Sequence, residues 1–219
     1  MSLKSIRLLA LPLMLALPMA ADVLQLTGTG GASYGGDYVF PYYITVNGGT
    51  ALEMMCDDFL TNVTNDETWD ADAYSLIATN IPDLKFASEG SPSVVLNDYE
   101  MAAWIETGVA TGSIGAPDGN AAVWSIFDST FNTSVDQSNI TTILSDAQTA
   151  VDAGNLNYSG ITIYTPTPLD SSQEYITGIV TSSVPEPGSF MLLGSVLFAL
   201  GFFGRRRFAM ARNRAAVRD

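Results

Sequence analysis

The chain has 219 residues and carries 23 acidic residues against nine Lys and Arg. Between residues 22 and 188, Lys85 is the single cation among 22 acidic residues, so this segment has a net charge of −21 and would repel a nucleic-acid backbone. With no histidine and one cysteine, Cys56, the sequence excludes an intramolecular disulfide, zinc sites built on His and Cys, and Ser-His-Asp or Cys-His catalytic centres.

The first 21 residues have the pattern of a secretory signal peptide. Lys4 and Arg7 precede an apolar run at 8–17, and the small residues Ala20 and Ala21 follow it. The run is about half as long as the ~20 residues that a membrane span requires. We therefore interpret residues 1–21 as an export signal.

Residues 22–180 are predicted to form one acidic exported domain of the α+β class. Strands are expected at 23–26, at 38–46 and 51–60 around the Asn47-Gly48-Gly49 turn, and at 67–77. Further strands are expected at 161–164 and 174–180. Three helices are expected between these two groups of strands: one capped at Asn97 or Asp98 and ended by Gly108, one at 119–129 and one at 138–153. The order predicts a β-sheet or sandwich from N- and C-terminal strands with an inserted three-helix segment.

The C-terminal tail has three parts. Residues 181–188 form a linker that contains Pro185-Glu186-Pro187, which is stiff and non-helical. Residues 189–204 are predicted to form one transmembrane helix, whose uncharged part spans roughly 22 Å, less than the ~30 Å of a hydrocarbon core. Arg205, Arg206 and Arg207 then stop transfer, and the excess of positive charge places residues 205–219 in the cytoplasm.

This tail resembles the PEP-CTERM sorting signal of Gram-negative bacteria, because the Pro185-Glu186-Pro187 motif, the short span and the arginine cluster occur in that order. The resemblance implies anchoring in the inner membrane and processing by an exosortase near the motif. It also implies release to the cell surface or to an exopolysaccharide matrix, with exopolysaccharide or surface proteins as partners. Residues 208–219 extend past the arginines, where such tails usually end.

Cys56 and Asn120 form a second recognisable pattern. Cys56 lies in the sequence Met-Cys-Asp-Asp-Phe, and Asn120 begins Asn-Ala-Ala-Val-Trp. These motifs resemble the thioester domains of bacterial surface adhesins, in which an early-strand Cys bonds to the Gln of a Gln-x-Ala-[Ile/Val]-Trp helix. Here Asn120 replaces that Gln and is one methylene shorter, so we interpret the pair as a thioester remnant and Cys56 as a buried apolar residue.

Two other kinds of site remain open from the sequence. Six acidic residues could hold a cation, but they lack the spacing of a calcium-binding EF-hand loop, so a solvated acidic loop is the better explanation: Asp57, Asp58, Asp66, Glu67, Asp70 and Asp72. A carbohydrate-active enzyme would need paired carboxylates, and Trp69, Trp104 and Trp124 could line a sugar cleft or pack in the core. We therefore predict a non-catalytic interaction module with no cofactor, metal or catalytic residue; the alternatives are an adhesin-like thioester domain acting through Cys56 and a carbohydrate-active enzyme.

Overall fold

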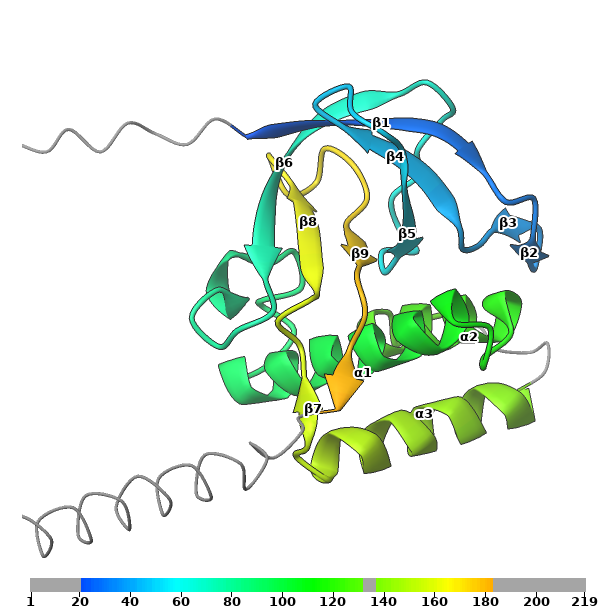
Figure 1. The fold of residues 1–219 in the computed structure, drawn as a ribbon, viewed down its shortest axis with the longest axis vertical. Coiled ribbons are helices and arrows are strands. Elements are labelled where there is room, and N and C mark those ends of the chain that lie inside the picture. The colour runs from blue at the N-terminus through cyan, green and yellow to red at the C-terminus, as the bar shows by residue number, and fades with distance from the viewer. Residues whose placement is uncertain (1–20, 132–136, 183–219) are drawn as a thin grey trace, which may run out of the picture.

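The computed structural model describes residues 21–131 and 137–182, and six strands in it close into an antiparallel barrel (Figure 1). The order around the barrel is β1 (Asp22–Thr29), β4 (Tyr42–Val46), β5 (Leu52–Cys56), β9 (Tyr175–Thr177), β8 (Thr162–Pro166) and β6 (Thr68–Ser75). The predicted α+β class is confirmed, including the contribution of both N- and C-terminal strands.

The barrel closes because β1 is longer than the sequence pattern indicates. The strand continues through Gly28 to Thr29, with a shift of register between Leu26 and Gly28. It pairs with β4 along one edge and with β6 along the other, so that Leu24 lies opposite both Val46 and Trp69. A bulge of this kind bends a strand and increases its twist, so the predicted sheet of N- and C-terminal strands closes into a barrel and does not form a sandwich.

Three helices form a layer under one end of the barrel, and α3 lies on the side away from it (Figure 1). They are α1 (Pro92–Ala110), α2 (Ala116–Phe127) and α3 (Gln137–Asp152). The first begins earlier than the predicted cap at Asn97 or Asp98, because Pro92 takes the first turn, where a missing N–H costs nothing. The other two agree with prediction to within three residues.

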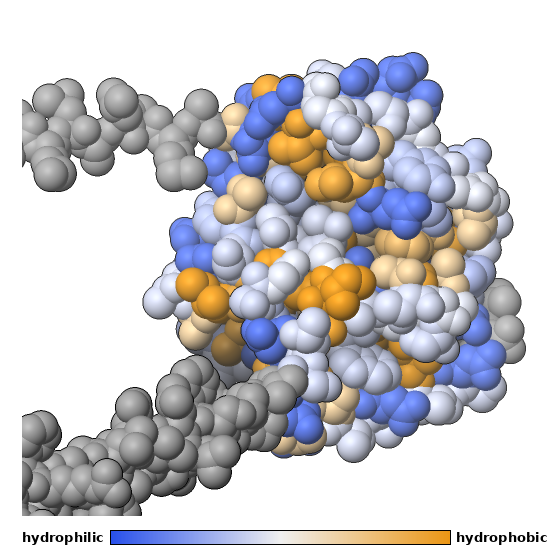
Figure 2. Space-filling view, viewed as in Figure 1, coloured by the Kyte–Doolittle hydropathy of each residue, from blue (hydrophilic) through white to orange (hydrophobic). Residues whose placement is uncertain are grey.

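The core has two parts. One fills the barrel with side chains such as Leu24, Ile44 and Tyr175, and the other lies between the barrel and the helices around Tyr99 and Trp124. Both parts lie within residues 22–182. The face in Figure 2 carries separate apolar patches among polar residues, so it presents no single broad apolar surface.

Two short strand pairs and one 3-10 helix complete the described structure. A hairpin joins β2 (Ser33–Tyr34) to β3 (Asp37–Tyr38), and η1 (Ile81–Asp83) precedes the helices. Strand β10 (Thr181–Ser182) pairs with β7 (Leu156–Asn157), so strand pairing continues two residues into the predicted linker.

Within the described residues no helix is long and apolar enough to cross a membrane. The predicted signal peptide, the transmembrane helix at 189–204 and the basic segment at 205–219 lie outside those residues.

Candidate ligand-binding site

The structure brings Asn120 and Cys56 together, as the pairing of their motifs implies. Asn120 is fully buried on α2, and its Nδ2 donates a hydrogen bond of 2.9 Å to the backbone carbonyl of Cys56. Its Oδ1 accepts a hydrogen bond of 2.9 Å from the backbone N–H of Phe40. The Asn120 amide thus ties α2 to the end of β5 and to the segment before β4 through main-chain groups.

The Cys56 thiol is sealed in the barrel core. It is completely buried, and its Sγ donates to the backbone carbonyl of Asp58 at 3.0 Å. Burial, and then the neighbouring charges of Asp57 and Asp58, raise the pKa of the Cys56 thiol well above its ordinary value. A thiol that stays protonated is a weak nucleophile, so this environment suits a packing residue.

Asp57 and Glu174 form a buried acid pair where β5 ends and β9 begins. They are cross-strand neighbours, since the Asp57 N–H donates to the Glu174 carbonyl at 3.4 Å. The Glu174 carboxylate accepts from the Lys85 N–H at 3.0 Å, from the Thr165 hydroxyl at 2.5 Å and from the Tyr99 hydroxyl. Burial, and then the charge of Glu174, raise the pKa of Asp57 well above its ordinary value. Asp57 therefore holds a proton beside a Glu174 carboxylate that three protein donors hydrogen-bond.

Asp58 is the third buried carboxylate and takes the domain's one lysine as its partner. Lys85 Nζ lies 2.6 Å from Asp58 Oδ2, with both side chains almost entirely buried. The same Nζ also donates to the Ser172 carbonyl at 2.8 Å and to the Thr61 hydroxyl at 3.1 Å. In the part of the chain that the structure describes, no three Asp, Glu or Cys side chains converge as a metal site would require.

Glu106 is a further buried carboxyl on α1, next to Gly178, the residue that follows β9. It is 1 % exposed, its Oε2 has no hydrogen-bond partner among the described residues, and the N–H of Gly178 is its one donor. Burial raises the pKa of Glu106 to about 8.

This shift predicts a pH-dependent stability. The folded state keeps a proton on Glu106 that the unfolded chain releases from about pH 4.5, so stability is lost as the pH rises toward about 8. We expect Glu106→Gln, which stays neutral, to gain on the wild type by up to about 1.4 kcal/mol per pH unit across that window. Urea unfolding at a series of pH values measures the difference, and parallel curves for the two proteins would contradict it.

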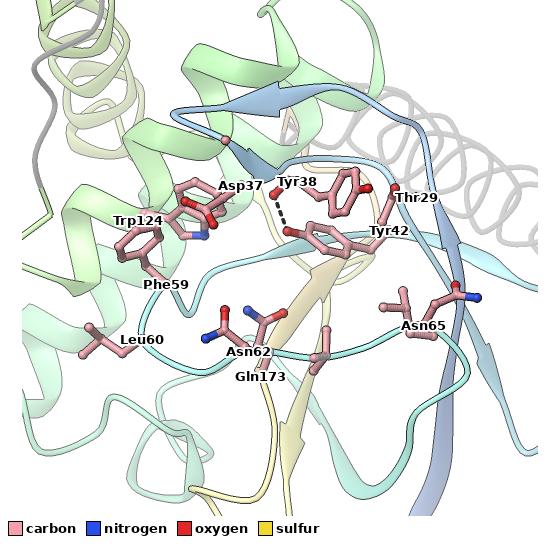
Figure 3. A pocket seen from close by; sticks show the side chains of 13 residues that line it. Thr29, Asp37, Tyr38, Tyr42, Phe59, Leu60, Asn62, Asn65, Trp124 and Gln173 are labelled. Atoms are coloured by element: carbon pink, nitrogen blue, oxygen red, sulfur yellow. Dashed lines mark hydrogen bonds between the residues drawn. The ribbon is translucent and has the colours of Figure 1, made fainter.

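An open cavity of about 680 Å³ lies beside this network, between the β2–β3 hairpin and the loop that follows β5. Aromatic side chains occupy one side in Figure 3, and the amides of Asn62 and Gln173 face them from the other. The lining includes aromatic, amide and acidic side chains: Tyr38, Tyr42, Phe59, Trp124, Asn62, Asn65, Gln173 and Asp37.

The walls of the cavity are held in place by the groups already described. The Phe59 ring, in the loop after β5, packs against the Trp124 ring with centroids 5.0 Å apart, and Trp124 lies on α2 one turn after Asn120. Gln173 Nε2 donates to the carbonyls of Asp58 and Thr61, which fixes the loop. A pocket with stiff aromatic walls and few polar groups is the usual form of a small-ligand site.

The sequence prediction singled out only Trp124 among these lining residues. Trp124 belongs both to the core and to the cavity, being 2 % exposed yet part of its wall. Trp69 lies inside the barrel and Trp104 packs against the helical core, so neither lines this cavity. Tyr38 in β3 and Leu60 in the loop after β5 are exposed apolar residues in the structure, and no pattern in the sequence marked them.

The fold and cavity define an α+β barrel domain with a lateral pocket, and comparison with known proteins adds the nature of its tail. Residues 183–207 match the PEP-CTERM protein-sorting motif. This match confirms the sorting signal predicted at Pro185-Glu186-Pro187 and Arg205, Arg206 and Arg207. The motif implies export, anchoring at the membrane through the tail, and processing by an exosortase.

The comparisons say less about the domain itself. No curated protein matches the chain. Among solved structures, the N-terminal domain of the Streptococcus pyogenes pilus tip adhesin Cpa is similar with a TM-score of 0.43 and 11% identity, over 78% of this chain and 97% of that one. A likeness at this level bears on neither the site nor its chemistry.

Proposed function

We propose that this protein is a non-catalytic component of the bacterial surface or extracellular matrix, which binds exopolysaccharide in the cavity between the β2–β3 hairpin and the loop after β5. The observation that carries the proposal is the lining of that cavity by aromatic rings and amides. Sugar rings present C–H faces that pack on aromatic side chains, and hydroxyls that pair with amide groups.

The carboxyl groups support a binding role over an enzymatic one. Hydrolysis of a glycosidic bond requires two carboxyl groups across the bond, whereas Asp37 is the one acidic residue among those lining the cavity. Asp57, Asp58 and Glu174 lie close by but are buried in their own hydrogen-bond network and do not line it. Among the described residues, the lining of the cavity therefore offers no second carboxylate where a bound sugar would need one.

The tail accounts for how the domain would reach such a ligand. We place exosortase cleavage near Pro185-Glu186-Pro187, followed by release of the acidic domain to the surface or matrix of a Gram-negative cell. Strand pairing persists to Ser182, so a cut near the motif leaves the described fold intact.

Binding to the native polysaccharide tests this proposal. Residues 22–182 contain the closed barrel and both core clusters, so this segment can be used alone. We expect it to be retarded in affinity electrophoresis through exopolysaccharide from the native cell, and Tyr38→Ala to weaken binding about tenfold because the ring is 59% exposed at the cavity. Tyr43→Ala, which removes a tyrosine that does not line the cavity, is the matched control. Equal retardation of both variants and the wild type would refute the proposal.

A second candidate is covalent adhesion through Cys56, which the contact between Cys56 and Asn120 favours. In the described geometry the Asn120 amide binds main-chain groups and the thiol donates to Asp58, so the non-covalent role has the stronger support.

A further inference from the structure

The charge of the cavity lining is negative only. Asp37 is exposed, forms no ion pair with any described residue, and is the one charged group among the lining residues. Lys85, the domain's single cation, is committed to Asp58 and does not line the cavity. With a net charge of −21 on residues 22–188, the surroundings add to this negative potential. An acidic sugar would be repelled from such a site.

The aromatic walls of the cavity, like its negative charge, favour a cationic ligand. Ring faces of Tyr and Trp attract ammonium groups through their quadrupoles, most strongly where water is partly excluded. Tyr38 and Tyr42 lie next to one another in the cavity, joined by a hydrogen bond from the Tyr42 hydroxyl to the Tyr38 carbonyl (Figure 3). Burial is the main cause of the raised pKa of the Tyr42 hydroxyl, and the nearby Asp37 carboxylate adds to it.

Unused amides supply the groups that a sugar needs. Asn62 and Asn65 are exposed and line the cavity, and their side chains make no hydrogen bond to any other described residue. Gln173, in contrast, has both ends occupied, since its Oε1 also accepts from the Tyr175 hydroxyl at 2.8 Å. Two free amides on one side and a free carboxylate on the other can bind hydroxyls and one cation.

We infer that the cavity selects saccharide units carrying a free, protonated amino group, as in a de-N-acetylated amino-sugar polymer, with the ammonium held between Asp37 and the tyrosine rings and the hydroxyls on Asn62 and Asn65. This inference rests on the proposed saccharide binding and names the class of sugar. A neutral sugar would use the rings and amides but would leave Asp37 without a partner.

A matched pair of ligands tests the inference directly. Glucosamine oligomers and N-acetylglucosamine oligomers of equal length share a backbone and differ in the ammonium group. In calorimetry with residues 22–182 at mildly acidic pH, we expect the amino form to bind about tenfold more tightly, and salt to weaken it selectively. Asp37→Asn should bring the two ligands to similar affinity, whereas Tyr38→Ala should weaken both.

Asp70→Asn is the control, because it removes the same charge from an exposed site on β6 away from the cavity. Equal effects of Asp37→Asn and Asp70→Asn would overturn the inference, since the attraction would then come from diffuse charge. Equal binding of the two oligomers, or binding of native exopolysaccharide with neither oligomer bound, would overturn the amino-sugar preference alone. Failure to bind any of the three ligands would overturn both this inference and the proposed function.

Discussion

Replacement of Lys85 by methionine is expected to lower the free energy of unfolding by about 3–5 kcal/mol, because it leaves Asp58 buried without its partner. The side chain of Asp58 is 2% exposed, and its Oδ1 already accepts from the N–H groups of Leu60 and Thr61. These two bonds hold the carboxylate in place, so it cannot turn to solvent when Nζ is lost. Urea unfolding of residues 22–182, followed by tryptophan fluorescence, measures the change.

The double variant Lys85→Met/Asp58→Asn separates the two contributions. Neutralising Asp58 removes the buried charge while its amide oxygen can still accept from Leu60 and Thr61. We therefore expect it to recover a large part of the stability that Lys85→Met loses. Asp70→Asn, on the exposed face of β6, should stay within about 0.5 kcal/mol of the wild type. A loss below about 1 kcal/mol for Lys85→Met would show that Lys85 does not compensate a buried charge.

The position of this lysine follows from the charge of the domain. Three buried carboxyl groups, Asp57, Asp58 and Glu174, lie in the segments where β5 ends and β9 begins. Lys85 contacts two of them. Its Nζ forms an ion pair with Asp58, and its backbone N–H donates a hydrogen bond to the Glu174 carboxylate. The third, Asp57, has no cation beside it and is kept neutral by its raised pKa. One cation therefore suffices, because the protein neutralises the remaining group with a proton.

Local patterns in the sequence were sufficient to predict the sorting motif of the tail and most of the regular elements of the domain. A sorting motif and a helical period are properties of neighbouring residues, so they can be read without the fold. The start of α1 was missed because polar residues at 97 and 98 offered a plausible cap, although Pro92 sits better in a first turn. Barrel closure was missed because the strand was expected to end at residue 26, whereas β1 continues past a bulge through Gly28 to Thr29.

The cavity was not predictable in the same way. Its walls come from the β2–β3 hairpin, the loop after β5, helix α2 and Gln173, which are distant in sequence and meet only when the barrel closes. Asp37 is one of 22 acidic residues between 22 and 188, and nothing in its neighbourhood distinguishes it. The pairing of Cys56 and Asn120 was accessible because it relied on recognisable short motifs. The atoms that make this contact could not be predicted, because a motif does not specify which main-chain groups an amide will bind.

Asn120→Ala is expected to cost about 2–4 kcal/mol, since it leaves both the Phe40 N–H and the Cys56 carbonyl buried without partners. Residues 40 and 56 flank the hairpin of β4 and β5, so the loss should also loosen the contact of α2 with the barrel. Asn62→Ala, which truncates an exposed asparagine, should change stability by less than about 0.5 kcal/mol. A cost for Asn120→Ala below about 1 kcal/mol would contradict a structural role for this amide.

Asn120→Gln distinguishes that role from covalent chemistry. The site is fully buried, so the extra methylene should cost about 1–3 kcal/mol by overpacking. If Asn120 acts only as a structural tie, the wild-type domain will show its unmodified intact mass, since a thioester with Cys56 would release ammonia and remove about 17 Da. A deficit of that size in the wild type would instead establish that the short asparagine reaches the thiol, and would make covalent capture the function of the domain. A deficit in Asn120→Gln alone would show that the barrel still holds the geometry for the bond and that the missing methylene is what separates this protein from the adhesins that its motif resembles.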